Sequence, residues 1–156
     1  MTLEENKRLV RECFDVLNKQ FEDPEHYDAS VLNKVLSPKW ANEITSWFPG
    51  LNRLWPDHHI DITNMVAEGD KVRCRLATRA THCGEWEGIA GNGTHWTNTG
   101  IWYLTVVDGK IIDVDSTFDT LNLVKQIGGQ GSQTRLDSGV LIKLAATWEG
   151  IKAAEV

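Results

Sequence analysis

The chain has 156 residues and a net charge of −6 at pH 7, and 41% of its residues are hydrophobic. This length is enough for one well-buried core and short for two, which predicts a single domain. Lys and Arg are interspersed with acidic residues and form no basic patch, which argues against nucleic acid as the main partner. The sequence has no apolar run that could span a membrane, and its first ten residues are too charged for a signal peptide. We therefore expect a cytoplasmic protein without a membrane partner.

Cysteine and histidine spacing gives no sign of a metal site. The three cysteines, Cys13, Cys74 and Cys83, form no close C-x-x-C pair, so neither a disulfide framework nor a zinc site is predicted. His58 and His59 have no third ligand beside them. The seven tryptophans are many for this length, because each indole brings a large, rigid apolar surface. We expect most of them in the core and some of them around a cavity.

The first part of the chain has the pattern of helices. Apolar residues recur at helical spacing over 3–21, and Thr2 followed by Glu5 has the pattern of a capping box. A second helical stretch is predicted at 29–36, and a third, rich in tryptophan, at 40–54. These three stretches are expected to cover one side of a sheet.

After Pro56 the period of the hydrophobic residues changes to two, which predicts antiparallel strands. Alternate residues from Val72 to His82 share one face of a strand, and this face is expected to turn inward. Further strands are predicted at 95–107 and 110–118. Helices followed by a meander of antiparallel strands predict an α+β fold with a curved sheet.

The last strand leads into a short helix. Asp108-Gly109 is a turn signal, Asp119 suits the N-cap of a helix at 121–127, and Gly128 ends that helix. We expect residues 1–128 to form the main domain. A hinge and an extra helix with an apolar stripe are predicted at 129–156.

Two segments carry a family resemblance. They are T-H-C-G-E-W-E-G-I-A-G-N-G-T-H-W-T-N-T-G at 81–100 and D-G-K-I-I-D-V-D-S-T-F-D-T-L-N-L-V-K-Q-I-G at 108–128. Both resemble the SnoaL-like polyketide cyclases of the NTF2-like superfamily, and M-V-A-E-G-D at 65–70 is similar more loosely. The resemblance implies a conical α+β barrel with a deep apolar pocket between sheet and helices. It also implies a dimer formed through the sheet and acid–base catalysis without a cofactor.

The sequence departs from the resembled family at the catalytic positions. The family's general base, an Asp on the closing strand, falls on Ser116, and two family histidines fall on Trp102 and Val114. A serine has no useful basicity near neutral pH, so the family's proton abstraction cannot be carried over unchanged. A polar residue at the start of the third helical stretch is kept as Asn42.

Three residues are candidates for acid–base catalysis, and each has a structural alternative. Asp115 would reach the pocket if a bulge near Ser116 turned it inward, whereas a straight strand turns Asp113 and Asp115 outward. Asp119 is either the acid–base group or only a helix cap. His82, on the inward face, is either a proton shuttle or a hydrogen-bonded residue at the rim.

Other inward residues are candidates for substrate binding. Neutral amides suit the binding of a carbonyl or enolate oxygen, and aromatic rings suit the stacking of a polycyclic substrate, although both types also occur in ordinary cores. The predicted binding residues are Trp40, Asn42, Trp47, Asn64, Asn98, Trp102, Ser116 and Phe118.

These features predict a cofactor-independent cyclase or isomerase of secondary metabolism that acts as a homodimer. Its substrate would be a bulky, mostly apolar polyketide or terpenoid intermediate, such as a meroterpenoid. One alternative is an epoxide hydrolase or epoxide-opening cyclase, which would need Arg79 to face the pocket. A lactone hydrolase and a non-catalytic NTF2-like binding module are further alternatives.

Overall fold

The structure is a computed structural model that describes residues 1–128. The predicted hinge and C-terminal helix at 129–156 lie outside the described residues. Helices and strands follow one another as α1 (Leu3–Glu22), the 3-10 helix η1 (Ala29–Lys34), α2 (Pro38–Thr45), α3 (Phe48–Leu54), β1 (His59–Glu68), β2 (Lys71–Thr81), β3 (His95–Val107), β4 (Lys110–Phe118) and α4 (Thr120–Gly128). The predicted α+β fold is confirmed.

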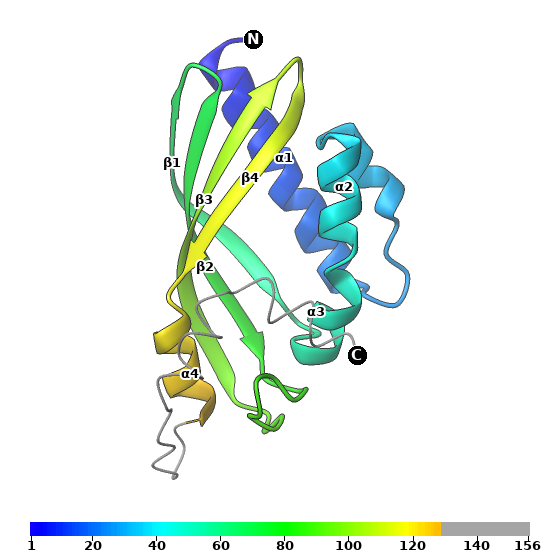
Figure 1. Cartoon of the computed structure of the whole chain (residues 1–156), viewed down its shortest axis with the longest axis vertical. Coiled ribbons are helices and arrows are strands. Elements are labelled where there is room, and N and C mark those ends of the chain that lie inside the picture. The colour runs from blue at the N-terminus through cyan, green and yellow to red at the C-terminus, as the bar shows by residue number, and fades with distance from the viewer. Residues whose placement is uncertain (129–156) are drawn as a thin grey trace.

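The four strands form one antiparallel sheet in the order β1-β2-β3-β4. Figure 1 shows the strands as a long, curved sheet with α1, α2 and α3 on the same side. The core lies between this inner face and the helices, where alternate residues of β2 and β3 are buried. The opposite, outer face of the sheet carries charged and polar residues. The sheet with its helices on one side is the arrangement that the strand meander predicts.

The first helix forms as its sequence predicts. The Thr2 hydroxyl accepts a hydrogen bond from the Glu5 backbone N–H at 3.2 Å, and the Glu5 carboxylate accepts one from the Thr2 N–H at 2.6 Å. This capping box satisfies backbone donors at the helix start. The residues of α1 that turn to the sheet are Val10, Cys13, Phe14, Leu17 and Phe21.

The third helical stretch differs from its prediction, because it consists of two helices, α2 and α3. Pro49 explains the break between them. A proline inside a helix lacks the backbone N–H and its ring clashes with the carbonyl of the preceding turn, whereas it is tolerated in the first turn. The new helix accordingly begins at Phe48, which puts Pro49 in its first turn.

A bulge in β1 overturns the predicted orientation of Asn64. The pairing of β1 with β2 shifts between Ile62 and Asn64. One extra residue moves the later side chains to the opposite face. Met65 and Ala67 therefore turn toward the core, while Asn64 and Val66 are exposed on the outer face. The expectation that Asn64 points inward was wrong for this reason.

A second irregularity lies in β4, but not near Ser116, where a bulge would have turned Asp115 inward. The pairing of β3 with β4 shifts at Thr105 and Val106, and Ile112 is the extra residue on β4. From Asp113 to Phe118 the pairing is regular. The Asp108-Gly109 turn that precedes β4 has both residues at positive φ, as predicted for such a hairpin turn.

Candidate functional site

On the inner face, the position of the resembled family's base lies in an aromatic environment. Ser116 pairs with Trp102 on the neighbouring strand. Trp102 is 1% exposed, and its ring lies 5.0 Å from that of Phe14, measured between centroids. Phe118, two residues further along β4, is half-buried on the same face. Serine and aromatic rings therefore occupy this part of the inner face, and they offer no base.

Asp115 lies on the outer face and does not reach the core. The regular pairing of β4 places it opposite Tyr103, with its side chain exposed. Its Oδ1 accepts a hydrogen bond from the Ser116 backbone N–H at 2.8 Å. The inward turn of Asp115 would have needed a bulge near Ser116, and the extra residue is Ile112 instead. That placement was therefore wrong.

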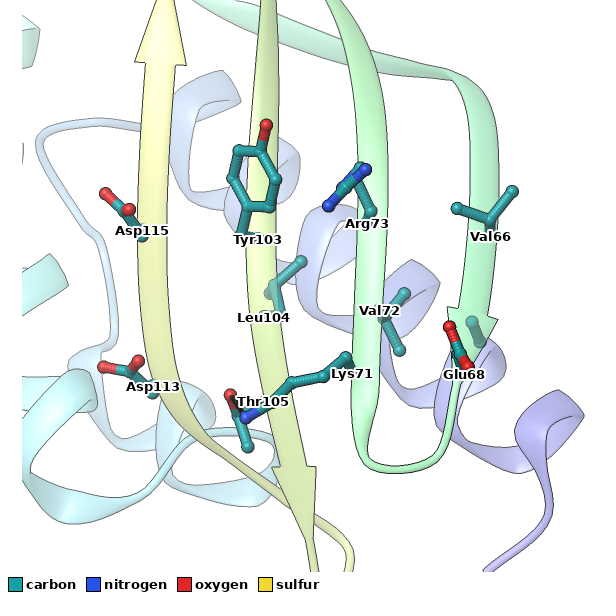
Figure 2. A pocket seen from close by; sticks show the side chains of 11 residues that line it. Val66, Glu68, Lys71, Val72, Arg73, Tyr103, Leu104, Thr105, Asp113 and Asp115 are labelled. Atoms are coloured by element: carbon teal, nitrogen blue, oxygen red, sulfur yellow. Dashed lines mark hydrogen bonds between the residues drawn. The ribbon is translucent and has the colours of Figure 1, made fainter.

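The outer face holds a groove of about 550 Å³. Figure 2 shows its side chains, with Asp115 of β4 beside Tyr103 of β3 and Asp113 beside Thr105. The Arg73 guanidinium lies 4.6 Å from the centre of the Tyr103 ring. The groove therefore combines charged groups with an aromatic ring on an open surface.

Asp119 caps α4. Its Oδ1 accepts a hydrogen bond from the Asn122 backbone N–H at 3.1 Å, and its own N–H donates to the Thr99 carbonyl at 3.1 Å. The side chain is exposed. The capping interpretation of Asp119 is confirmed, and this cap fastens the start of α4 to β3. Gln126 on α4 completes the attachment, because its amide exchanges two hydrogen bonds with the Thr97 backbone.

Of the asparagines expected to point inward, the structure buries one. Asn98 is 5% exposed, and its Oδ1 accepts a hydrogen bond from the Asn122 side chain at 3.3 Å. Asn42 is exposed, contrary to expectation, because the buried face of α2 carries Ala41 and Ile44. One residue further along a helix turns the side chain by about 100°.

The two tryptophans predicted to bind substrate from the helices differ in burial. Trp47, between α2 and α3, is 3% exposed. Trp40 on α2 is half-buried, and the Lys39 ammonium lies 5.5 Å from the centre of its ring. Trp47 thus belongs to the core, whereas Trp40 lies at its edge.

His82 is the candidate acid–base residue that the structure places inside the protein. It follows β2 and has no exposed surface. Its Nε2 lies 3.1 Å from the Ile89 carbonyl oxygen. A carbonyl only accepts, so this partner assigns the proton to Nε2 and leaves Nδ1 as an acceptor when the ring is neutral. Nδ1 is buried and has no hydrogen-bond partner within residues 1–128.

The Ile89 carbonyl that contacts His82 belongs to a loop whose Trp86 is part of a group of aromatic side chains, and we call this group together with His82 the indole–imidazole cluster. Trp55 is at its centre, with ring centroids 5.5 Å from Trp86, 5.1 Å from Trp96 and 6.1 Å from His58. The cluster consists of Trp55, His58, His82, Trp86 and Trp96. Burial lowers the pKa of His58 from 6.5 to about 4, so this ring is neutral at pH 7.

Each member of the indole–imidazole cluster has a ring nitrogen without a described partner. The Nε1 atoms of Trp55, Trp86 and Trp96 and the Nδ1 atoms of His58 and His82 are buried and form no hydrogen bond within the described chain. Sequence reasoning singled out neither Trp55 nor Trp86 and considered His58 only as a metal ligand. The number of tryptophans was the signal that a larger aromatic assembly exists.

The remaining reactive groups do not extend this site. Burial raises the thiol pKa of Cys13 and of Cys74 to about 12, so both thiols are protonated at neutral pH. Arg79 is exposed and donates a hydrogen bond to Asp61 at 2.7 Å on the outer face. It therefore does not face the core, as an epoxide-opening relay would need.

Two general properties concern the described part of the chain only. Residues 1–128 contain no group of three or more His, Cys, Asp or Glu side chains that could hold a metal ion. In the same range, no helix has the length and apolar character needed to cross a membrane.

Comparison with curated proteins gives only local matches. A transaldolase of Gibberella intermedia is 44% identical over 64 residues, a match that covers 34% of this chain and 19% of the transaldolase. A transaldolase of Allorhizobium ampelinum is 43% identical over 58 residues and is covered to 18%. The chain thus spans about a fifth of the length of these relatives, so the matches assign it no activity.

Solved structures show the same fold over most of the chain. AclR, a putative hydroxylase from Streptomyces galilaeus, has a TM-score of 0.68 at 23% identity and covers 95% of this chain and 96% of its own. IdmH, a putative polyketide cyclase from Streptomyces antibioticus, has a TM-score of 0.67 at 17% identity. The match covers 79% of this chain and 98% of IdmH. The family model described as SnoaL-like polyketide cyclase matches residues 25–127. The chain therefore belongs to the SnoaL-like polyketide cyclase family.

Proposed function

We propose that the protein is a cofactor-independent cyclase or isomerase of a bulky, mostly apolar polyketide or terpenoid intermediate, with His82 as its acid–base group. Family membership supports the reaction class. The observation that carries the assignment to His82 is its buried Nδ1, which has no partner within the described residues. Asp115 lies on the outer face and Asp119 serves as a cap, which leaves His82 as the buried member of the three candidates.

The proposed reaction moves one proton through the imidazole. Nδ1 of neutral His82 takes a proton from a carbon that lies between two carbonyl groups, and the electrons of the broken C–H bond form an enolate. Indole N–H groups of the indole–imidazole cluster donate hydrogen bonds to the enolate oxygen. The enolate then attacks a second carbonyl or is reprotonated, and the imidazolium returns its proton to the product oxygen or carbon. This sequence needs no redox step.

The side chains of the indole–imidazole cluster favour an apolar substrate with few oxygen atoms. Trp55, Trp86 and Trp96 are each at most 5% exposed, and aromatic faces bind flat, apolar molecules. The polar atoms available there are single ring nitrogens. A polycyclic or meroterpenoid intermediate with isolated carbonyl or hydroxyl groups fits this set better than a sugar or a nucleotide.

We also propose that the protein works as a homodimer that pairs the outer faces of two sheets. Basic residues on β2, among them Lys71 and Arg73, and acidic residues on β4 flank the exposed Tyr103 of β3, and Val66 is exposed on β1. A twofold arrangement can place the basic strand of one copy over the acidic strand of the other. Tyr103→Glu should therefore shift the protein from dimer to monomer, as measured by light scattering after gel filtration. An unchanged mass would contradict this arrangement.

The test of the proposed activity is a turnover assay with a synthetic poly-β-ketone ester and with aromatic polyketide intermediates that carry a β-diketone. We expect ring closure or isomerisation without added metal or nucleotide. Chromatography and mass spectrometry identify the products. Treatment with a chelator should leave the rate unchanged. A rate that depends on a chelatable metal, or equal rates for wild type and His82→Gln, would contradict the proposal.

A further inference from the structure

We propose that residues 83–94, here called the Trp86 loop, form a lid over an internal binding site within the indole–imidazole cluster. In the closed form the Trp86 indole fills this site. The ligand that replaces it is a flat aromatic molecule with a hydroxyl or carbonyl oxygen. The identification of this ligand as substrate rests on the proposed function, whereas the site and its lid rest on the structure alone.

The base of the Trp86 loop is firmly attached. The Cys83 N–H donates to the Leu54 carbonyl at 2.9 Å, and the N–H groups of Asn92 and Gly93 donate to the His82 carbonyl at 3.0 and 2.9 Å. The two stems approach so closely that a Cβ on Gly91 would clash with the Cys83 carbonyl oxygen. The base is thus a fixed point about which the tip can move.

The tip of the Trp86 loop is held by much less. Trp86 and Ile89 exchange two backbone hydrogen bonds across a tight turn, and Glu87 and Gly88 within the turn have positive φ. These bonds lie inside the tip and do not attach it to the rest of the protein. Within residues 1–128, one hydrogen bond attaches residues 85–90 to the rest of the protein. It joins His82 Nε2 to the Ile89 carbonyl. Packing of Trp86 on Trp55 is the other attachment, at 5.5 Å between the ring centroids and an angle of 73°.

The buried ring nitrogens of the indole–imidazole cluster indicate what the site binds. A buried donor or acceptor without a partner costs free energy, so such groups are rare, and five of them in one cluster need an explanation. Indole N–H groups match a carbonyl or hydroxyl oxygen, and His82 Nδ1 accepts a hydroxyl proton. A ligand with these groups supplies partners that residues 1–128 do not provide in the closed form.

The ligand must also take over the packing of Trp86. The Trp86 indole is 2% exposed and meets Trp55 edge to face, an arrangement that favours aromatic pairs. A crevice beside Trp55, lined also by Phe21 and Phe48, has a volume of about 10 Å³, which is no larger than a water molecule needs. This crevice is too small for an aromatic ligand, and in our proposal the ligand instead takes the place of the Trp86 indole against Trp55.

Movement of the lid changes what holds the proton on the His82 ring. In the closed form the Ile89 carbonyl holds the proton on Nε2 and leaves Nδ1 free to accept. When the tip moves away, this bond is lost and the proton is free to occupy either nitrogen. In the open form, a ligand hydroxyl that donates to Nδ1 then keeps the proton on Nε2.

The test uses 2-naphthol as the probe, because it combines a flat aromatic ring with one hydroxyl. Trp86→Ala removes the side chain that competes with the ligand, so we expect calorimetric titration to show at least tenfold tighter binding than to the wild type. Tyr103→Ala, which removes an aromatic ring from the outer face of the sheet, is the control and should bind as the wild type does. Equal affinities of the two variants, or no binding to Trp86→Ala, would overturn the proposal.

Amide hydrogen exchange of the wild-type protein provides a second test that does not depend on the folding of the Trp86→Ala variant. The Trp86 and Ile89 amides bond to each other, and saturation with 2-naphthol should speed their exchange at least tenfold because the ligand holds the lid open. The Leu76 amide in the sheet should not change. Unchanged or slower exchange at Trp86 and Ile89 would contradict the lid. Neither test involves turnover, so a failed lid and a failed assignment of His82 as catalyst give separate results.

Discussion

The two faces of the sheet both carry aromatic and titratable side chains, but these side chains are exposed on the outer face and buried on the inner side. On the outer face, Asp113, Asp115 and Arg73 lie along an open groove of about 550 Å³. On the inner side, the indole–imidazole cluster is closed to solvent and contains the buried rings of His58 and His82. Acid–base groups are selective where substrate displaces water, so this difference supports the proposal that a histidine rather than a carboxylate carries the chemistry.

Adjacent residues of β3 show how sharply the two faces differ, and they allow a direct test. Trp102 packs on Phe14 and is 1% exposed, whereas Tyr103 is 38% exposed. Trp102→Ala should lower the free energy of unfolding by about 3–5 kcal/mol, the usual cost of emptying a large aromatic core position. Tyr103→Ala should cost less than about 1 kcal/mol, as is typical of the surface. Urea titration of dilute protein measures both values, and equal losses would contradict the assigned faces.

The burial of His58 predicts how stability depends on pH. Burial lowers the pKa of His58 in the folded protein to about 4, while the unfolded chain keeps about 6.5. Between these two values the unfolded state binds more protons, so stability is full above pH 6.5 and falls as the pH decreases to 4. The loss amounts to about 3 kcal/mol from this group.

Denaturant titrations at pH 7 and pH 4.5 measure this loss, and His58→Gln serves as its control because it removes the titrating ring. The variant should lose less stability between the two pH values than the wild type does. If both proteins responded to pH in the same way, His58 would not be the buried neutral ring described here.

A smaller effect is expected from Asp119, the candidate that the structure identifies as a cap. Asp119→Ala removes the acceptor of the Asn122 N–H and should cost about 1 kcal/mol in the free energy of unfolding. Asp119→Asn should cost only a few tenths of that, because asparagine caps nearly as well. Both variants should keep wild-type turnover. A hundredfold loss of turnover in Asp119→Asn, with the fold intact, would show that Asp119 moves a proton after all.

The fold could be predicted from local patterns, because helical and strand periodicity together determine an α+β arrangement. The capping box of α1, the Asp108-Gly109 turn and the cap at Asp119 all follow from residue types that have few alternative uses. The family resemblance at 81–100 and 108–128 agrees with the match at 25–127.

The orientation of individual site residues could not be predicted in the same way. A bulge adds one residue without any strong sequence signal, and it reverses every side chain beyond it. The bulge after Ile62 turned Asn64 outward, and of the two alternatives for β4 the pairing is regular at Ser116, with the extra residue at Ile112, which leaves Asp115 outside. The indole–imidazole cluster escaped prediction because its members come from β3 and from the loops before β1 and β3, and only the folded chain brings them together.

The most direct test compares turnover of His82→Gln with that of Asp115→Asn on the poly-β-ketone or aromatic intermediate that the wild type converts. Both substitutions remove a titrating group while nearly preserving its size, and they differ in the face of the sheet on which they lie. If His82 is the acid–base group, His82→Gln should lower kcat by a factor of about 10² or more and Asp115→Asn should leave it unchanged. A large loss in Asp115→Asn together with full activity in His82→Gln would contradict the assignment and place the chemistry on the outer face.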